Sequence, residues 1–217
     1  MSYRLFRRVA ILGLVACPPV DAATVEVAVT NSDGMPAANA VVSLAPDSPS
    51  AAIPPHAPAR SVIDQRHETF LPLVTLVRKG GEVIFTNNDT TMHQVYSFSP
   101  IRQFQFEIDE AQTSRPVLFD KAGVAAIGCN IHDNMVAYIF VADAPYAAVT
   151  NAAGRAEFRD IPRGAYRAAA WHPQMRIGRA PPPAQLTVGS ETVALALALP
   201  LTRTAMPDMS RHRKSDY

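Results

Sequence analysis

Cysteine is scarce in this chain, which has only two cysteines in 217 residues. Cys17 lies close to the N-terminus, so Cys129 is the only cysteine in the rest of the sequence. Two cysteines cannot build the multiple-disulfide framework of a small secreted domain. We therefore do not expect Cys129 to serve a structural disulfide. Metal ligation is one explanation for this lone thiol, and burial as a small hydrophobic side chain is the alternative.

The chain also lacks an excess of charge of either sign. It has 20 Lys and Arg against 19 Asp and Glu, a formal net charge of +1. Nucleic-acid-binding proteins are typically strongly basic, so no nucleic-acid partner is expected. No phosphate-binding loop, serine–histidine–aspartate order or open metal triad stands out in the sequence. We therefore do not expect an enzyme.

The apolar run over residues 9–17 is too short to span a membrane. Three arginines precede the run and small residues follow it, which is typical of an export signal. We predict a signal peptide over residues 1–22 and a periplasmic protein. Residues 14–17 also fit a bacterial lipobox, so a lipoprotein anchored through Cys17 is the alternative. Removal of residues 1–22 takes away three Arg and one Asp, leaving 17 basic and 18 acidic residues.

Short alternating apolar runs predict strands and no long helix. Val25, Val27 and Val29 alternate with other residues in a period of two. Similar runs recur about every ten residues between turn sequences, which is typical of an all-β sandwich. The predicted strands cover residues 24–30, 40–44, 61–65, 73–78, 82–86, 93–98, 103–108, 116–119, 124–129, 135–141, 156–158, 165–171, 185–188 and 193–199. Residues 46–58 contain five prolines and predict a linker, and a disordered tail is predicted over 201–217.

The most informative segment of the chain is residues 128–135. It contains Cys129, His132 and Met135, with two residues between each and the next. His93 lies 36 residues before the cysteine. One thiolate, two imidazoles and one thioether are the donor set of a blue-copper electron-transfer site. The alternatives are an inert core thiol, structural histidines, Met135 as a core filler, and a zinc site, which a thioether disfavours.

Residues 56–145 resemble the cupredoxin family, and the spacing Cys129-x-x-His132-x-x-Met135 is similar to the short ligand loop of amicyanin. Residues 77–87, which precede the first histidine, and residues 119–125, which lead to the cysteine, also resemble the family. This resemblance implies a Greek-key sandwich that binds one copper ion at a type 1 site.

The same resemblance implies a role for each of the four donors. His93, Cys129 and His132 would lie in a trigonal plane around the copper, with Met135 as the long axial ligand. The protein would transfer one electron at a time to or from a periplasmic redox partner. His132 would be the exit, with Met92 and Ile131 lining an apolar patch around it.

Two residues depart from the cupredoxin pattern. Gln94 stands where the family usually has an asparagine that ties the ligand loops together. Gly128 stands where an aromatic residue often precedes the cysteine. Both changes predict a looser surrounding of the ligands, and with it a spectrum or potential that differs from that of amicyanin.

Residues 23–47 and 147–200 resemble a second fold, a small Ig-like sandwich of the carboxypeptidase-regulatory or transthyretin-like type. The cupredoxin segment would then be an insertion into one loop of that sandwich, which exposed loop tips tolerate well. The combination is similar to bacterial proteins labelled methylamine utilisation protein.

The expected function is therefore that of an exported blue copper protein. Two other functions stay open at this point. One is copper storage or delivery to another protein, and the other is a structural or interaction protein with a vestigial site. The remaining histidines, His56, His67 and His172, are predicted to be structural.

Overall fold

The computed structural model describes residues 22–48, 59–176 and 178–201. Within these ranges every regular element is a β-strand, so the prediction of an all-β chain is confirmed. The same ranges contain no helix with the length and apolar character needed to cross a membrane. Apart from Ala22 and Leu201, the predicted signal peptide with Cys17 and the predicted tail lie outside the described residues, as do residues 49–58 of the proline-rich segment.

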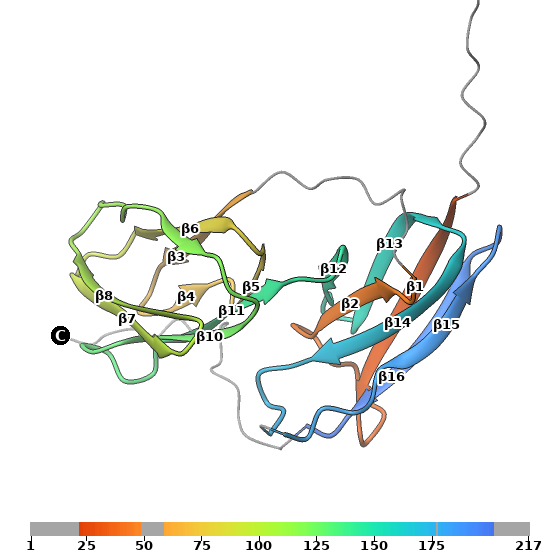
Figure 1. The fold of residues 1–217 in the computed structure, drawn as a ribbon. Helices are drawn as coiled ribbons and strands as arrows, with labels where there is room; N and C mark the ends of the chain where they lie inside the picture. Colours follow the sequence, from red (N-terminus) through yellow and green to blue (C-terminus); the bar gives the residue numbers. More distant parts are fainter. Residues whose placement is uncertain (1–21, 49–58, 177, 202–217) are drawn as a thin grey trace, which may run out of the picture.

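The strands form two assemblies that lie side by side (Figure 1). The first, which we call the split sandwich, contains β1 (Ala22–Asn31), β2 (Val41–Pro46), β12 (Tyr146–Val149), β13 (Arg155–Pro162), β14 (Gly164–Trp171), β15 (Ala184–Val188) and β16 (Val193–Leu199). The second, which we call the central sandwich, contains β3 (Arg60–Gln65), β4 (Phe70–Leu71), β5 (Val74–Arg78), β6 (Gly81–Asn87), β7 (His93–Ser99), β8 (Arg102–Ile108), β9 (Val117–Phe119), β10 (Gly123–Cys129) and β11 (Val136–Ala142).

Each assembly consists of two sheets. The split sandwich has the strand orders β13-β1-β16 and β12-β2-β14-β15. The central sandwich has the orders β4-β3-β6-β9 and β5-β11-β10-β7-β8. Three pairs of neighbours are parallel, β1 with β16, β3 with β6 and β5 with β11, so the chain crosses between the sheets as in other sandwiches with long connections.

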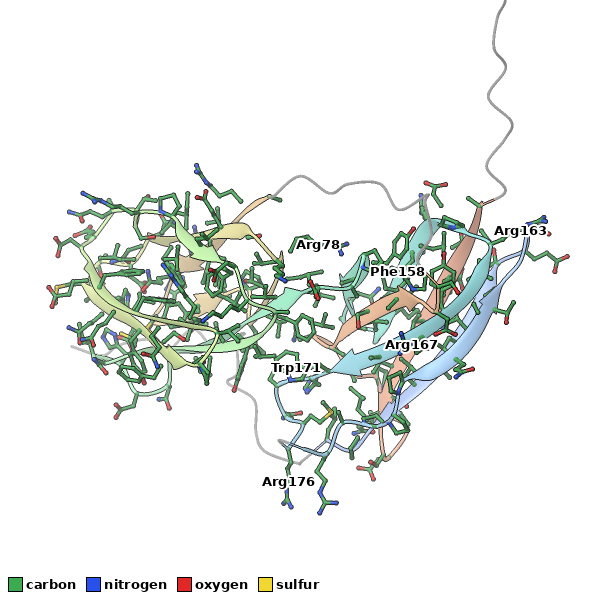
Figure 2. All side chains as sticks on the ribbon, viewed as in Figure 1. Arg78, Phe158, Arg163, Arg167, Trp171 and Arg176 are labelled. Carbon is green, nitrogen blue, oxygen red and sulfur yellow. The ribbon has the colours of Figure 1, made fainter. Side chains whose placement is uncertain are left out.

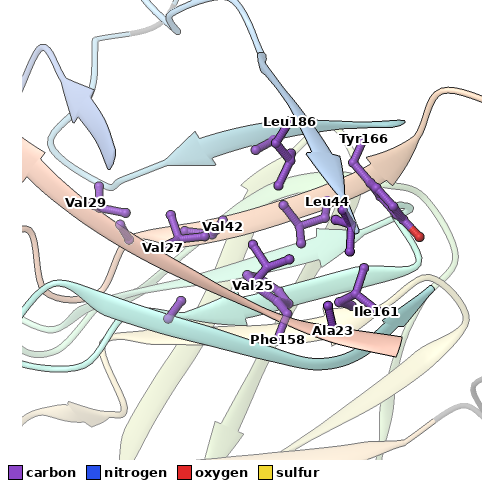
Figure 3. Close-up of a cluster of buried hydrophobic side chains, with 14 of the residues drawn as sticks. Ala23, Val25, Val27, Val29, Val42, Leu44, Phe158, Ile161, Tyr166 and Leu186 are labelled. Atoms are coloured by element: carbon purple, nitrogen blue, oxygen red, sulfur yellow. The ribbon is translucent and has the colours of Figure 1, made fainter. Parts of the chain in front are cut away.

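The core of the split sandwich follows from the alternation in β1. Val25, Val27 and Val29 are buried, and they pack with Leu44 of β2 and Phe158 of β13 (Figure 3). Burying a valine side chain contributes about 1.5–3 kcal/mol. The predicted half-buried strand at this position is confirmed.

The core of the central sandwich is rich in aromatic and branched side chains. Phe85 of β6 and Phe119 of β9 come from one sheet, and Ile127 and Ile139 come from the other. All four side chains are fully buried. The two sheets of the central sandwich pack through these side chains, and this close-packed core holds β7 and β10 in place, because such cores resist displacement.

Two strands escaped the sequence prediction. β4 has only two residues, too few for any periodic pattern. β12 has four residues that are all half-buried, so its sequence shows no alternation. Both exist because a longer strand is available to pair with: β3 for β4, and β2 for β12.

Along the chain, the central sandwich is placed between two strands that are neighbours in one sheet of the split sandwich. β2 precedes it and β12 follows it, and these strands pair with Val41 opposite Val149. The Thr150 hydroxyl accepts a hydrogen bond from the Ala40 amide at 2.9 Å and donates one to the Ala37 carbonyl at 2.7 Å. The segment between β2 and β12 therefore begins and ends at adjacent strands of the split sandwich, whose sheet is complete without that segment.

An apolar contact joins the two sandwiches. Trp171, at the end of β14, packs against Tyr138 and Phe140 of β11, with ring centroids 5.9 and 5.6 Å apart (Figure 2). The buried residues Val41 and Leu73 belong to the same cluster. The two sandwiches are therefore packed together and not merely joined by the chain.

His172 is a buried histidine at the end of this contact. Its Nε2 donates to the Ala38 carbonyl at 2.9 Å, and its Nδ1 accepts from the Gln174 amide at 3.1 Å. This arrangement needs the neutral imidazole, since a proton on Nδ1 would face an N–H group. Burial lowers the pKa of His172 below its ordinary value, partly opposed by the Ala38 carbonyl.

This lowered pKa predicts a loss of stability as the pH falls. Above the ordinary histidine value of about 6.5 both folded and unfolded chains carry neutral His172. As the pH falls from there toward the folded-state pKa, only the unfolded chain binds the proton. We expect His172→Gln to lower the free energy of unfolding at pH 8 by about 1–3 kcal/mol and to flatten its decline between pH 7 and 5. Denaturant unfolding at several pH values checks this, and parallel pH profiles for the two proteins would contradict it.

Candidate metal centre

Two neighbouring strands and one loop bring the predicted ligands together. His93 is the first residue of β7, and Cys129 is the last residue of β10. These strands pair in antiparallel register, with Cys129 opposite Val95. His132 and Met135 lie in the loop between β10 and β11. The four residues predicted from the sequence thus come from one end of the central sandwich.

Three of the four donors form a tight cluster. Cys129 Sγ lies 3.8 Å from His93 Nδ1, and His132 Nδ1 lies 3.2 Å from the same nitrogen. The three donor atoms all lie within 4.8 Å of one another. In the part of the chain that the structure describes, this is the one such group of His, Cys, Asp and Glu side chains.

Burial differs among the three residues. His93 is fully buried and Cys129 is 5% exposed. The His132 side chain is 21% exposed, so it is the donor that reaches the surface. The Cys129 thiol and the His93 imidazole are therefore shielded from solvent, and the partly exposed His132 imidazole is the group that solvent reaches.

Met135 lies at the closing end of the ligand loop. Its amide donates to the His132 carbonyl at 3.1 Å, which turns the chain back toward β11. Its side chain is buried in the same core cluster as Cys129. The loop therefore buries Met135 and leaves His132 at the surface.

Asp89 holds the outer nitrogen of His93. Its Oδ2 lies 2.9 Å from His93 Nε2, so Nδ1 is the nitrogen directed toward Cys129 and His132. Carboxylates bonded to the far nitrogen of a histidine fix its tautomer and raise its basicity as a ligand. Asp89 is thus part of the centre, although the sequence marked it only as a turn residue.

Asn87 shapes the loop that positions Asp89. Its buried amide donates to the carbonyls of Thr91 and Ile108, and its oxygen accepts from the Asp89 amide. No pattern in the sequence predicts this role, because an exposed turn asparagine and a buried asparagine that organises a loop differ only in their tertiary contacts.

Gln94 ties the two ligand segments together. Its side-chain oxygen accepts from the Asn130 amide group at 2.6 Å, and its backbone carbonyl accepts from the Asn130 N–H at 3.1 Å. The expectation that Gln94 leaves the ligand loops loosely connected is therefore wrong. The longer glutamine reaches Asn130 across the strand pair and makes the link itself.

Gly128 is also compensated. It lies opposite Tyr96 in the β7–β10 pair, and the Tyr96 ring covers it. A Cβ atom at Gly128 would lie 2.6 Å from the end of that ring. An aromatic side chain is thus present beside Gly128, supplied by the neighbouring strand, and the effect of Gly128 on the spectrum or potential stays a prediction.

A large exposed apolar side chain lies next to each histidine in sequence. Ile131, next to His132, is 45% exposed, and Met92, next to His93, is 40% exposed. The Glu68 carboxylate also lies at His132, with its Oε1 3.7 Å from His132 Nε2. The apolar side chain of Ile131 and a carboxylate therefore both adjoin His132.

Comparison with known proteins gives partial similarities. No family model and no curated protein matches this chain. Among solved structures, it is similar to a purple cupredoxin from Nitrosopumilus maritimus, with 21% identity and a TM-score of 0.34, over 39% of this chain and 99% of that one. It is similar to amicyanin from Paracoccus versutus, with 22% identity and a TM-score of 0.35, over 46% and 98%.

A third similarity is to the copper-containing nitrite reductase of Thermus scotoductus SA-01. The identity is 20% and the TM-score 0.36, over 45% of this chain and 25% of the reductase. Each of these similarities covers less than half of the present chain. At this level of similarity the functional interpretation depends on the residues of the centre themselves.

The contact between Gly128 and Tyr96 predicts a coupled effect on stability. We expect Gly128→Ala to lower the free energy of unfolding by about 1–3 kcal/mol, because the added methyl group displaces the Tyr96 ring. In a Tyr96→Ala background the same substitution should cost at least about 1 kcal/mol less. Denaturant unfolding of the two single variants and the double variant measures the difference.

Gly189→Ala is the matched control, since a Cβ at Gly189 meets nothing within 4 Å. Its effect should stay within about 0.5 kcal/mol. An equal cost of Gly128→Ala with and without the Tyr96 ring would contradict the contact.

Proposed function

We propose that the centre binds one copper ion through His93, Cys129, His132 and Met135 and that the protein transfers single electrons. The observation that carries this proposal is the convergence of a buried thiol with two imidazoles, whose donor atoms, one from each residue, lie within 4.8 Å of one another. Copper, when bound, supplies a one-electron couple. Thiolate, thioether and imidazole are donors that suit copper in both of its common oxidation states.

The donor set favours copper over zinc. Structural zinc sites use cysteine and histidine, and methionine is a poor zinc ligand. Met135 is buried in the same cluster as Cys129 and follows His132 by three residues. Assignment of Met135 as the fourth ligand rests on this placement and on the cupredoxin resemblance of the loop.

Rigidity of the centre favours electron transfer over catalysis. Cys129 and His93 are buried at the ends of paired strands, and the Gln94–Asn130 link fixes the two segments. A preformed set of donors supports similar geometry before and after an electron moves, and it leaves no position for a substrate. We therefore assign no enzymatic reaction to the centre.

His132 is the proposed route for the electron. It is the partly exposed donor of the cluster. Met92, next to His93 in sequence, and Ile131, next to His132, are large exposed apolar side chains. A small apolar surface of this kind fits the brief docking of a redox protein. We propose a periplasmic redox partner, because the predicted signal over residues 1–22 directs export.

The domain division follows the two sandwiches. We propose that residues 56–145 are a cupredoxin domain inserted between β2 and β12 of a carboxypeptidase-regulatory or transthyretin-like sandwich, which comprises residues 23–47 and 147–200. The pairing of β2 with β12 supports this division, because the split sandwich needs no strand from the intervening segment.

Copper loading with a cysteine variant tests the proposed function. The full chain should bind one copper per chain and develop an intense visible absorption band, because a bound thiolate transfers charge to Cu(II). Cys129→Ala should lose the band. His172→Gln, which changes a histidine outside the cluster, should keep it. The measurement is an absorption spectrum combined with metal analysis and a redox titration.

Four other results, one of them from the addition of an apo acceptor protein, would lead to a different conclusion. Copper binding without the band, or a band that survives in Cys129→Ala, contradicts ligation by the thiolate. Loss of copper to an apo acceptor without reversible redox cycling supports delivery instead of electron transfer. No copper binding by the unmodified chain contradicts the proposal as a whole.

A further inference from the structure

The turn between β3 and β4 lies next to the centre and has an unusual backbone. Arg66 and Thr69 exchange two backbone hydrogen bonds, at 3.0 and 3.1 Å, across the two residues between them. Those residues, His67 and Glu68, have φ angles of 52° and 51°. Two successive left-handed residues are typical of Asn-Gly turns, and they are unfavourable for side chains with a Cβ.

One carboxylate holds this turn in place. Asp89 accepts hydrogen bonds from the His67 amide and from the Glu68 amide, the latter at 2.9 Å. The oxygen that accepts from Glu68 is also the oxygen bonded to His93 Nε2. Asp89 therefore connects the unfavourable turn directly to a proposed ligand.

The turn in its observed conformation places Glu68 over the other histidine. Glu68 Oε1 lies 3.7 Å from His132 Nε2, which is an ion-pair distance and too long for a hydrogen bond. Each histidine of the centre thus has a carboxylate at the nitrogen that faces away from Cys129. Neither carboxylate belongs to the ligand motif, and the turn that presents Glu68 is held by Asp89.

We propose that Asp89 and the His67–Glu68 turn form a clasp in which Glu68 is a positioning residue for His132. This inference rests on the proposed copper site. The Glu68 carboxylate favours a His132 ring orientation with Nδ1 inward, and its negative charge stabilises the more highly charged oxidation state of the metal. Asp89 does the same for His93 and keeps Glu68 in place.

The clasp makes the effects of the two carboxylates interdependent. If Asp89 is replaced, the turn loses two of its hydrogen bonds and has no reason to keep its left-handed conformation. Glu68 then no longer stands over His132, so its own replacement should matter little. Two independent charges would instead contribute additively, because neither would need the other for its position.

A double-mutant cycle on the full chain tests the clasp. The affinity for Cu(II) is measured by competition with a chelator, and the reduction potential is measured on the loaded protein. Glu68→Gln should weaken Cu(II) binding about fivefold to tenfold and make the potential more positive; the effect is modest because Glu68 is 57% exposed. Asp89→Asn should weaken binding about 10–100-fold. Adding Glu68→Gln to Asp89→Asn should change the affinity less than twofold.

Asp133→Asn is the matched control. It removes an exposed carboxylate directly next to His132 in sequence, and it should change the affinity less than twofold. Equal effects of Asp133→Asn and Glu68→Gln would reduce the clasp to a general surface-charge effect and overturn it. Additive effects of Glu68→Gln and Asp89→Asn, or no effect of Glu68→Gln, would overturn it as well.

Copper binding by the unmodified chain distinguishes a failure of this inference from a failure of the proposed function. If that chain binds copper normally and one of the three contradicting outcomes for the variants is found, the clasp alone is rejected. No copper binding by that chain rejects the copper site and the clasp together. Unfolding of the metal-free variants is measured in parallel, and a Glu68→Gln protein of unchanged stability but reduced copper affinity supports a positioning role.

Discussion

Strand β7 pairs with β10 so that Val95 lies opposite Cys129, and this register places Cys129 beside His93 at the start of the loop that carries His132 and Met135. A shift of one residue would turn His93 away from the thiol, because side chains alternate between the two faces of a strand. The register is secured from inside by the apolar core, where Val95 and Ile127 are buried. It is secured from outside by the Gln94–Asn130 link and by the Tyr96 ring over Gly128.

Around this strand pair, polar groups do the finer positioning. Asn87 is buried and bonds two backbone groups of the loop that carries Asp89 and the Ile108 carbonyl at the end of β8. Asp89 in turn binds His93 and the turn that presents Glu68. Buried networks of this kind favour one geometry, since every alternative leaves a buried polar group without a partner. The packed core therefore fixes the strand register, the register places the loops, and the loops place the carboxylates beside the histidines.

The sequence predicted those parts of the molecule that follow from local pattern. The alternation of Val25, Val27 and Val29 predicted β1, and the spacing of Cys129, His132 and Met135 pointed to the ligand loop. It did not predict Glu68, because the contact of Glu68 with His132 arises when two separate loops meet in the folded chain. It did not predict Asp89, which precedes His93 by four residues, because a turn carboxylate gives no sign in the sequence of the direction in which it points. β4 was missed because two residues carry no period.

Gln94 and Gly128 show why a family pattern alone misled. Each departs from the cupredoxin pattern at its own position, and each is compensated by a residue on another segment, Asn130 in one case and Tyr96 in the other. Such exchanges conserve a contact while changing the residues that make it. They become visible only when the partners are placed in space.

The central claim is that a thiolate and two imidazoles of this chain bind copper together. X-ray absorption at the copper edge of the loaded full chain tests it most directly, because it reports the atoms bound to the metal without reference to function. The account predicts one short copper–sulfur bond together with two imidazole nitrogens. A shell made only of nitrogen and oxygen atoms would contradict it.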